Sequence, residues 1–302
     1  MTNFHRHTKR IKREAGLAHI IQSARSRELQ LRNQALQIRN AKLERRNQAL
    51  LCLPTVDHLS KHSRLSSIRH PGTCVRLQNT LQFNYWFTSA NSTCLCCYGI
   101  PGSGKSVLAA SLMAVLQGRL DAARKDIICY YYFDYADHRS LDTPRIVASL
   151  IKQALENSPL DHFDEMFSYL YGRSHSLPTL AESTNYLAST LQHFGSVYIV
   201  LDGIDELRAD EQANAFKLIE TLLQRPSIIV KVSVTSRTKG FRVKRALQRH
   251  GTLYMFQDKV DADIAKFVEE EVEMTEAPHP LTVEPTLKFE VIQALVQGAK
   301  GM

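Results

Sequence analysis

The sequence predicts an α/β fold in which helices cover both faces of a parallel β-sheet. Two observations lead to this prediction: continuous apolar runs of strand length recur along the chain, and amphipathic stretches separate them. A strand that is buried on both faces is apolar throughout, whereas a strand with one solvated face alternates apolar and polar residues. The runs are TCLCCY (93–98), IICYYYF (127–133), VYIVL (197–201), IIVKVSV (228–234) and TLYMF (252–256).

The amphipathic stretches have the apolar spacing of helices. Each follows one of the first three predicted strands, so strands and helices alternate along the chain. This alternation predicts a three-layer α/β/α arrangement around a five-stranded parallel sheet. The stretches are KSVLAASLMAVLQ (105–117), PRIVASLIKQAL (144–155) and EQANAFKLIETLL (211–223).

The turn after the first strand carries the clearest chemistry. GIPGSGKS (99–106) fits the phosphate-loop pattern G-x-x-x-x-G-K-[ST] and lies between a strand and a helix, as this motif requires. Its small residues let backbone N–H groups point at phosphate oxygens, and the helix dipole adds its positive end. We expect Lys105 to reach the β- and γ-phosphates and the Ser106 hydroxyl to bind Mg²⁺. The residues predicted to bind the nucleotide, ATP or GTP, are Gly99, Ile100, Pro101, Gly102, Ser103, Gly104, Lys105, Ser106 and Val107.

Three acidic residues follow the third strand, in VYIVLDGIDELRAD (197–210). Ligands of open parallel sheets bind outside the carboxyl ends of the strands, so these acids should face the same crevice as the phosphate loop. Asp202 is predicted to bind Mg²⁺, directly or through water, because a buried carboxylate without a partner is strongly disfavoured. Asp205 and Glu206 are predicted to orient or polarise the water that attacks the γ-phosphate. The alternative is that both cap the helix that follows.

The fourth strand ends in VTSRTKG (234–240), which brings Thr235, Ser236 and Arg237 to the same edge of the sheet. Arg237 is predicted to contact the γ-phosphate and to distinguish triphosphate from diphosphate. In the alternative, Arg237 pairs with Asp205 or Glu206 and only organises the site.

The six cysteines include one CxxC spacing, Cys94 to Cys97. A zinc site would need a second pair at ligand spacing, which the sequence lacks. Four of the six cysteines lie in apolar runs, so we interpret them as buried structural thiols.

The first fifty residues form a basic arm with helical composition. They hold 12 Lys/Arg against 3 Asp/Glu, whereas the net charge of the whole chain is +8. The run Lys9–Arg13 (KRIKR) could serve nuclear import or bind a polyanion, or it could be a solvated helix face. No apolar run reaches the length of a membrane span, so we expect a cytoplasmic location. The basic run Lys9–Arg13 makes the nucleus a second possible location.

The arm also carries a heptad pattern that would place four leucines on one stripe of a helix. The companion core positions are polar, which predicts a weak coiled coil or a helix that packs on a neighbour. The leucines are Leu29, Leu36, Leu43 and Leu50, and the companions are Ser26, Asn33, Asn40 and Asn47.

A polar segment follows the arm and contains the turn-forming residues Pro54, Pro71 and Gly72. It ends in the aromatic cluster LQFNYWF, which holds the single tryptophan, Trp86. This segment is interpreted as a linker that docks onto the next domain. The predicted divisions are a basic helical arm (1–51), the linker (52–90), the P-loop NTPase core (91–259) and the start of a helical extension (260–302).

Three segments in order, GIPGSGKS, VYIVLDGIDEL and VTSRTKG, resemble the NACHT family of signal-transducing P-loop NTPases, the STAND class. More narrowly, the chain is similar to the nephrocystin-like NACHT modules of many fungal NOD-like receptors, over roughly residues 65–302. The N-K-x-D motif of Ras-like GTPases and the L-S-G-G-Q segment of ABC ATPases do not occur.

The resemblance implies slow ATP or GTP hydrolysis that works as a switch, with nucleotide-dependent self-association that brings N-terminal effectors together. VIQALVQGAKGM (291–302) resembles the middle of a longer helical region of the family, and the arm is short for an effector domain. We therefore expect a fragment that lacks the effector and repeat-domain partners of the family.

Three functions follow as hypotheses. The first is a slow Mg²⁺-dependent NTPase switch. The second is a scaffold that a bound nucleotide stabilises without significant turnover. The third is a basic arm that binds nucleic acid or acidic lipid, although no aromatic residues interleave its charges for base stacking.

Overall fold

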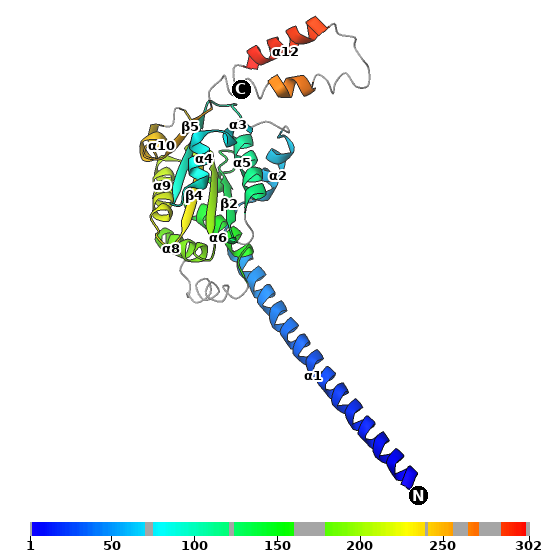
Figure 1. Cartoon of the computed structure of the whole chain (residues 1–302). Helices are drawn as coiled ribbons and strands as arrows, with labels where there is room; N and C mark the ends of the chain where they lie inside the picture. Colours follow the sequence, from blue (N-terminus) through cyan, green and yellow to red (C-terminus); the bar gives the residue numbers. More distant parts are fainter. Residues whose placement is uncertain are drawn as a thin grey trace. The chain divides into compact units, whose positions relative to one another are not determined.

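The structure, a computed structural model, falls into two units (Figure 1). One contains the helix α1 (Thr2–Cys52), and the other contains the β-sheet and the remaining helices. The residues that the structure describes are 2–69, 75–120, 124–159, 179–238, 241–255, 265–271 and 285–299.

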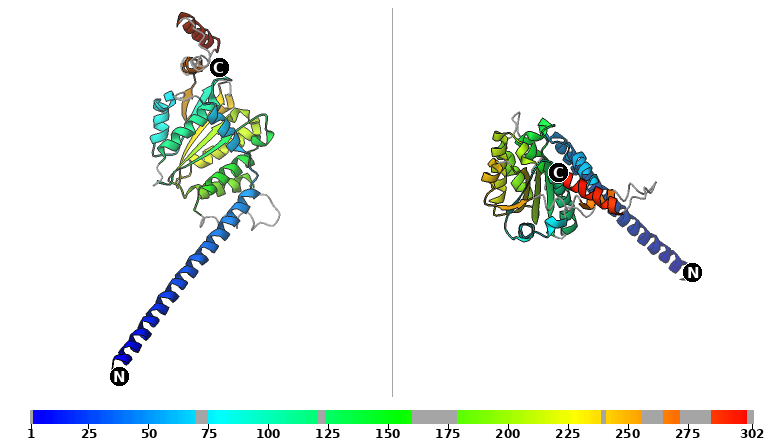
Figure 2. Two further views of the ribbon diagram at one scale, coloured as in Figure 1. Left: turned by 90° about the vertical axis from the view of Figure 1, so that its right-hand side faces the viewer. Right: turned by 90° about the horizontal axis from the view of Figure 1, so that it is seen from above.

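Five parallel strands form one sheet in the order β2-β3-β4-β1-β5, which confirms the predicted fold class. Helices flank the sheet on both sides (Figure 2). The strands are β1 (Thr93–Gly99), β2 (Ile127–Tyr132), β3 (Ser196–Asp202), β4 (Ile229–Arg237) and β5 (Gly251–Tyr254).

Two strands extend further than their apolar runs predicted. Asp202 is the last residue of β3, where it pairs with Tyr132, and Arg237 is the last residue of β4, where it pairs with Gly99. Backbone pairing with a neighbouring strand continues past the point where apolar side chains stop. Asp202 and Arg237 are therefore held by the sheet itself and not by a loop. Residue 256 of the fifth predicted strand lies outside the described residues.

Helices α5, α6 and α9 match the three predicted amphipathic stretches, whereas α8 and α10 were not predicted. One core cluster joins α5, α4 and the side chains of one sheet face, including Phe83, Trp86, Leu116 and Tyr198. Helices α6, α8 and α9 pack together and contact β2 and β4. The helices are α5 (Lys105–Arg119), α6 (Thr143–Glu156), α8 (Leu180–Leu191), α9 (Ala209–Leu223) and α10 (Phe241–Ala246).

Three helices occupy the described part of the segment that precedes β1. Thr80 caps the aromatic helix α4 by accepting a hydrogen bond from the Phe83 N–H. The buried Trp86 donates its indole N–H to the Val232 carbonyl of β4 at 2.9 Å, which ties α4 to the sheet. The helices are α2 (His58–Ser67), α3 (Val75–Gln78) and α4 (Leu81–Thr88).

The four strand cysteines, Cys94, Cys96, Cys97 and Cys129, are buried free thiols, as the sequence predicted. Burial raises the pKa of Cys97 and of Cys129 to about 12. Cys74 lies outside the described residues.

The helix α1 exposes Leu29 and Leu36 of the heptad pattern. The coiled coil stays a prediction. Two further helices, residues 265–271 and α12 (Pro285–Ala299), follow the last strand. Across the described ranges, no helix combines the length and the apolar character that a membrane span needs.

Candidate nucleotide-binding site

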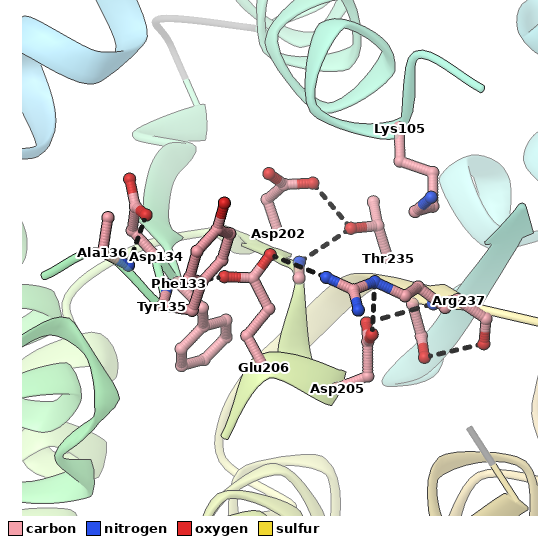
Figure 3. Close-up of polar contacts among 12 residues, drawn as sticks. Lys105, Phe133, Asp134, Tyr135, Ala136, Asp202, Asp205, Glu206, Thr235 and Arg237 are labelled. Carbon is pink, nitrogen blue, oxygen red and sulfur yellow. Dashed lines mark hydrogen bonds and ion pairs between the residues drawn. The ribbon is translucent and has the colours of Figure 1, made fainter. Parts of the chain in front are cut away.

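The sheet order brings the predicted site residues to one edge. Strand β4 lies between β1, which leads into the phosphate loop, and β3, which ends in Asp202. Arg237 at the end of β4 therefore lies between the phosphate loop and the acidic segment. Figure 3 shows Lys105, Asp202, Glu206 and Arg237 around a common space.

The phosphate loop has the backbone that its glycines allow. Gly102 and Gly104 have φ angles of 80° and 77°, a left-handed conformation that other residues rarely adopt. A Cβ atom on Gly99 would lie 2.3 Å from the Ser103 Oγ, so the loop closes tightly on this position. Glycine at these positions therefore gives the loop its shape.

The loop fits an anionic ligand. The Ser103 hydroxyl is buried, and none of the described residues offers it a hydrogen-bond partner. The helix α5 begins at Lys105, and within the described chain no side chain caps its first N–H groups. Uncapped N–H groups at a helix N-terminus attract phosphate. The site can therefore take the phosphates that the motif predicts.

Lys105 lies inside this loop. Its ammonium group donates hydrogen bonds to the Ile100 carbonyl at 2.7 Å and to the Gly99 carbonyl at 3.2 Å. Desolvation lowers the pKa of Lys105, and the nearby carboxylates of Asp205 and Asp202 oppose this shift. The side chain thus faces both halves of the site, as the motif requires.

Asp202 is buried, with 3% of its surface exposed. The Thr235 hydroxyl donates to its carboxylate at 2.6 Å and accepts from the Gly203 N–H at 2.8 Å. Burial raises the pKa of Asp202, while hydrogen bonds from Ser106 and Thr235 lower it. The structure therefore brings together the hydroxyl and the carboxylate that were predicted to bind Mg²⁺, both of which are oxygen ligands suited to this ion.

We predict that Thr235→Val lowers the free energy of unfolding by about 1–3 kcal/mol, because the buried Asp202 carboxylate loses a hydrogen-bond donor. Thr235→Ser keeps the hydroxyl, so its free energy of unfolding should fall clearly less than that of Thr235→Val. Chemical denaturation at neutral pH measures both variants. A Thr235→Val protein as stable as the wild type would contradict this role for the hydroxyl.

Asp205 and Glu206 lie in a 3₁₀ turn, η4 (Ile204–Glu206), which follows Gly203 with its φ of 84°. The Asp205 carboxylate accepts the Arg237 backbone N–H at 3.0 Å and forms an ion pair with the Arg237 guanidinium at 3.3 Å. The Glu206 carboxylate accepts the Tyr135 backbone N–H at 2.8 Å and lies 3.8 Å from the guanidinium.

These contacts bear on the alternatives for the acidic pair. The following helix α9 begins after Arg208, and no side chain of the described residues caps it with a hydrogen bond. The carboxylates of Asp205 and Glu206 instead contact Arg237 and Tyr135, and an effect of their charge on the N-terminus of α9 stays a prediction. The pairing of Arg237 with both acids is present, and half of the Arg237 side chain stays exposed. Burial raises the pKa of Glu206, which makes its carboxylate a stronger base.

Sequence reasoning missed three contacts at this site. The hydrogen bond of the Thr235 hydroxyl to Asp202 depends on strand order, which no single segment reveals. Tyr135 acts through its backbone N–H, which carries no side-chain signature. Lys61 comes from α2, far upstream of the motifs. Its positive charge partly offsets the rise that burial causes in the pKa values of Asp202 and Glu206.

The family model of the nephrocystin 3 N-terminal region matches residues 72–237. The chain belongs to this family. The matched range contains the phosphate loop, the acidic strand and Arg237. The nephrocystin-like resemblance is confirmed, and the chain has the P-loop NTPase architecture that serves nucleotide and Mg²⁺ binding in general.

No curated protein sequence matches the chain. Among solved structures, a DNA replication initiation factor shares 14% identity at a TM-score of 0.40, covering 78% of this chain and 59% of that one. A Walker-type ATPase of Pyrococcus abyssi shares 16% identity at a TM-score of 0.40, and the match covers 70% of this chain and 60% of that one. PCH-2 of C. elegans shares 16% identity at a TM-score of 0.38, and the match covers 82% of this chain and 60% of that one. The chain spans about three fifths of each of these proteins.

Proposed function

We propose that this chain binds a nucleoside triphosphate, ATP or GTP, with Mg²⁺ and hydrolyses it slowly as a switch. The observation that carries the proposal is the meeting of the phosphate loop with a buried carboxylate, Asp202, and with a second carboxylate of raised pKa, Glu206. A site for phosphate binding alone would not need two carboxylates near the anion, because they repel it.

In this proposal the residues divide the work. Lys105 and the loop N–H groups bind the phosphates. Ser106 and Asp202 would hold a Mg²⁺ ion, which would neutralise negative charge on the bound phosphates. Glu206 orients a water molecule and accepts its proton as the water oxygen bonds to the γ-phosphorus and the bond to the β–γ bridging oxygen breaks.

Arg237 is the proposed sensor of the γ-phosphate. Its guanidinium forms ion pairs with Asp205 and Glu206 and is half exposed. A γ-phosphate would compete with both carboxylates for this cation, because guanidinium groups bind phosphate in the same bidentate way as carboxylate. Arrival of the γ-phosphate would then free Glu206 from one ion pair.

The resemblance to nephrocystin-like NACHT modules supports a wider proposal. Triphosphate binding would favour self-association, and the chain would act in the cytoplasm in a NOD-like receptor-type signalling assembly. Effector and repeat-domain partners would come from other polypeptide segments. Gel filtration with ATP, ADP, GTP or GDP tests this step separately from hydrolysis.

Phosphate release tests the proposed hydrolysis. The full chain is incubated with ATP or GTP in Mg²⁺ and, as a control, in excess EDTA. Slow release that requires Mg²⁺ supports the proposal. Binding without measurable release would favour the scaffold, a function that the Arg237 ion pairs also fit because they organise the acids without any chemistry.

A further inference from the structure

A short turn at the end of β2, residues 133–136, holds the Glu206 carboxylate. The Phe133 N–H donates to the Asp202 carbonyl at 2.9 Å, so the turn starts beside the last residue of β3. Two residues later the Tyr135 N–H donates to the Glu206 carboxylate at 2.8 Å (Figure 3). The position of this N–H therefore sets the direction in which the carboxylate points.

The turn is built around Asp134. The Asp134 carboxylate accepts the Ala136 N–H at 3.0 Å. The Ser140 hydroxyl accepts the Asp134 N–H at 2.8 Å and donates to the Asp134 carbonyl at 3.0 Å. These bonds join the turn to Ser140, whose carbonyl accepts the Tyr131 hydroxyl at 3.0 Å.

A lysine from α2 adds a connection from the turn to a helix of the same unit. The Lys61 ammonium donates to the Phe133 carbonyl and to the Asp134 carboxylate, both at 3.0 Å, with 21% of its side chain exposed. The Asp57 side chain caps α2 through the Ser60 N–H at 3.1 Å. One turn of helix thus carries Lys61 to the start of the 133–136 turn. Two charge-assisted bonds at the same ammonium are stronger than neutral hydrogen bonds.

We propose that Lys61 is a positioning residue for Glu206: by clamping Phe133 and Asp134, it fixes the Tyr135 N–H that orients the carboxylate. The inference rests on the proposed role of Glu206 in hydrolysis. It adds a residue that lies outside all three motifs and upstream of the match to the nephrocystin 3 N-terminal family. It also makes the turnover rate depend on α2.

Charge supplies a second readout. The charged groups that face Glu206 are Arg237 of β4, Asp205 of η4, Lys61 of α2 and Lys105 of α5. Burial raises the pKa of Glu206, and the positive charge of Lys61 opposes this. Loss of that charge should raise the pKa further. Since a proton acceptor must be ionised, the acid limb of the kcat–pH profile should move to higher pH.

The test compares Lys61→Met with Lys61→Arg and with Lys217→Met, which removes an exposed lysine from α9. Hydrogen–deuterium exchange of the amides of residues 133–137, without nucleotide, reports on the turn. We expect about tenfold faster exchange in Lys61→Met, from the loss of a charged hydrogen-bond network. We also expect about a tenfold fall in kcat, a raised acid limb, and triphosphate affinity within about twofold of wild type. Lys61→Arg should recover part of kcat, and Lys217→Met should match the wild type.

Asp134→Asn provides a second variant, because it keeps an oxygen for the Ala136 N–H and removes the ion pair to Lys61. It should reproduce the faster exchange and the lower kcat. Unchanged exchange in Lys61→Met would overturn the proposal, and so would faster exchange with an unaltered kcat and pH profile. If the wild type shows no turnover, the proposed hydrolysis fails by itself, and the exchange data still decide whether Lys61 holds the turn.

Discussion

Replacement of Glu206 by glutamine is expected to lower the rate of phosphate release by about two to four orders of magnitude, the usual contribution of a positioned proton acceptor. Glutamine keeps the size of the side chain and an oxygen for the Tyr135 N–H, and it cannot accept the proton of the attacking water. The affinity for triphosphate should stay within a few fold, because Glu206 has no part in the proposed phosphate contacts.

Single-turnover phosphate release and equilibrium binding, measured on the same preparation, separate these two effects. Glu220→Gln, which neutralises an exposed glutamate on α9, is the matched control and should behave as the wild type. A Glu206→Gln protein that releases phosphate at the normal rate would remove Glu206 from the chemistry and leave Asp205 as the remaining carboxylate of the pair.

Lys105→Ala should weaken triphosphate binding by about 10- to 100-fold or more, because a hydrogen bond to a charged group contributes about 1.5–3 kcal/mol. At a triphosphate concentration about 100 times its Kd, the wild type should gain about 2.7 kcal/mol of stability. With a 100-fold weaker Kd, the same concentration should add less than about 0.5 kcal/mol.

Thermal unfolding with and without nucleotide measures this loss. Lys105 also bonds to the carbonyls of Gly99 and Ile100, so the variant is compared with its own nucleotide-free form. Lys217→Ala removes an exposed lysine from α9 and should keep the full nucleotide effect. If the nucleotide stabilised Lys105→Ala and the wild type equally, we would conclude that the phosphates do not bind at Lys105.

The sequence was sufficient for the fold class and for the parts of the site that lie in one segment. The five apolar runs each became a strand, and GIPGSGKS forms the loop between β1 and α5. These features are local, because a buried strand and a phosphate loop each need their residue types at fixed spacing.

The contacts that shape the acids depend on tertiary structure: the sequence offered the pairing of Arg237 with Asp205 or Glu206 only as an alternative, and it did not reveal the bond of Thr235 to Asp202. Strand β4 lies between β1 and β3, which brings Thr235 to Asp202 and Arg237 to Asp205. The order of the strands along the chain does not reveal that β4 lies between β1 and β3 in the sheet. The Tyr135 N–H that holds Glu206 is a backbone group, and any residue at that position would supply it.

The central claim is that the phosphate loop and Asp202 together bind a nucleoside triphosphate with Mg²⁺. Titration calorimetry of the full chain with ATP, GTP, ADP and GDP, each in Mg²⁺ and in EDTA, tests it most directly. The account predicts saturable one-site binding of at least one triphosphate in Mg²⁺, weakened in EDTA and in Asp202→Asn. The absence of saturable binding for all four nucleotides at concentrations up to about 1 mM, where even a ligand worth about 4 kcal/mol would be detected, would contradict it.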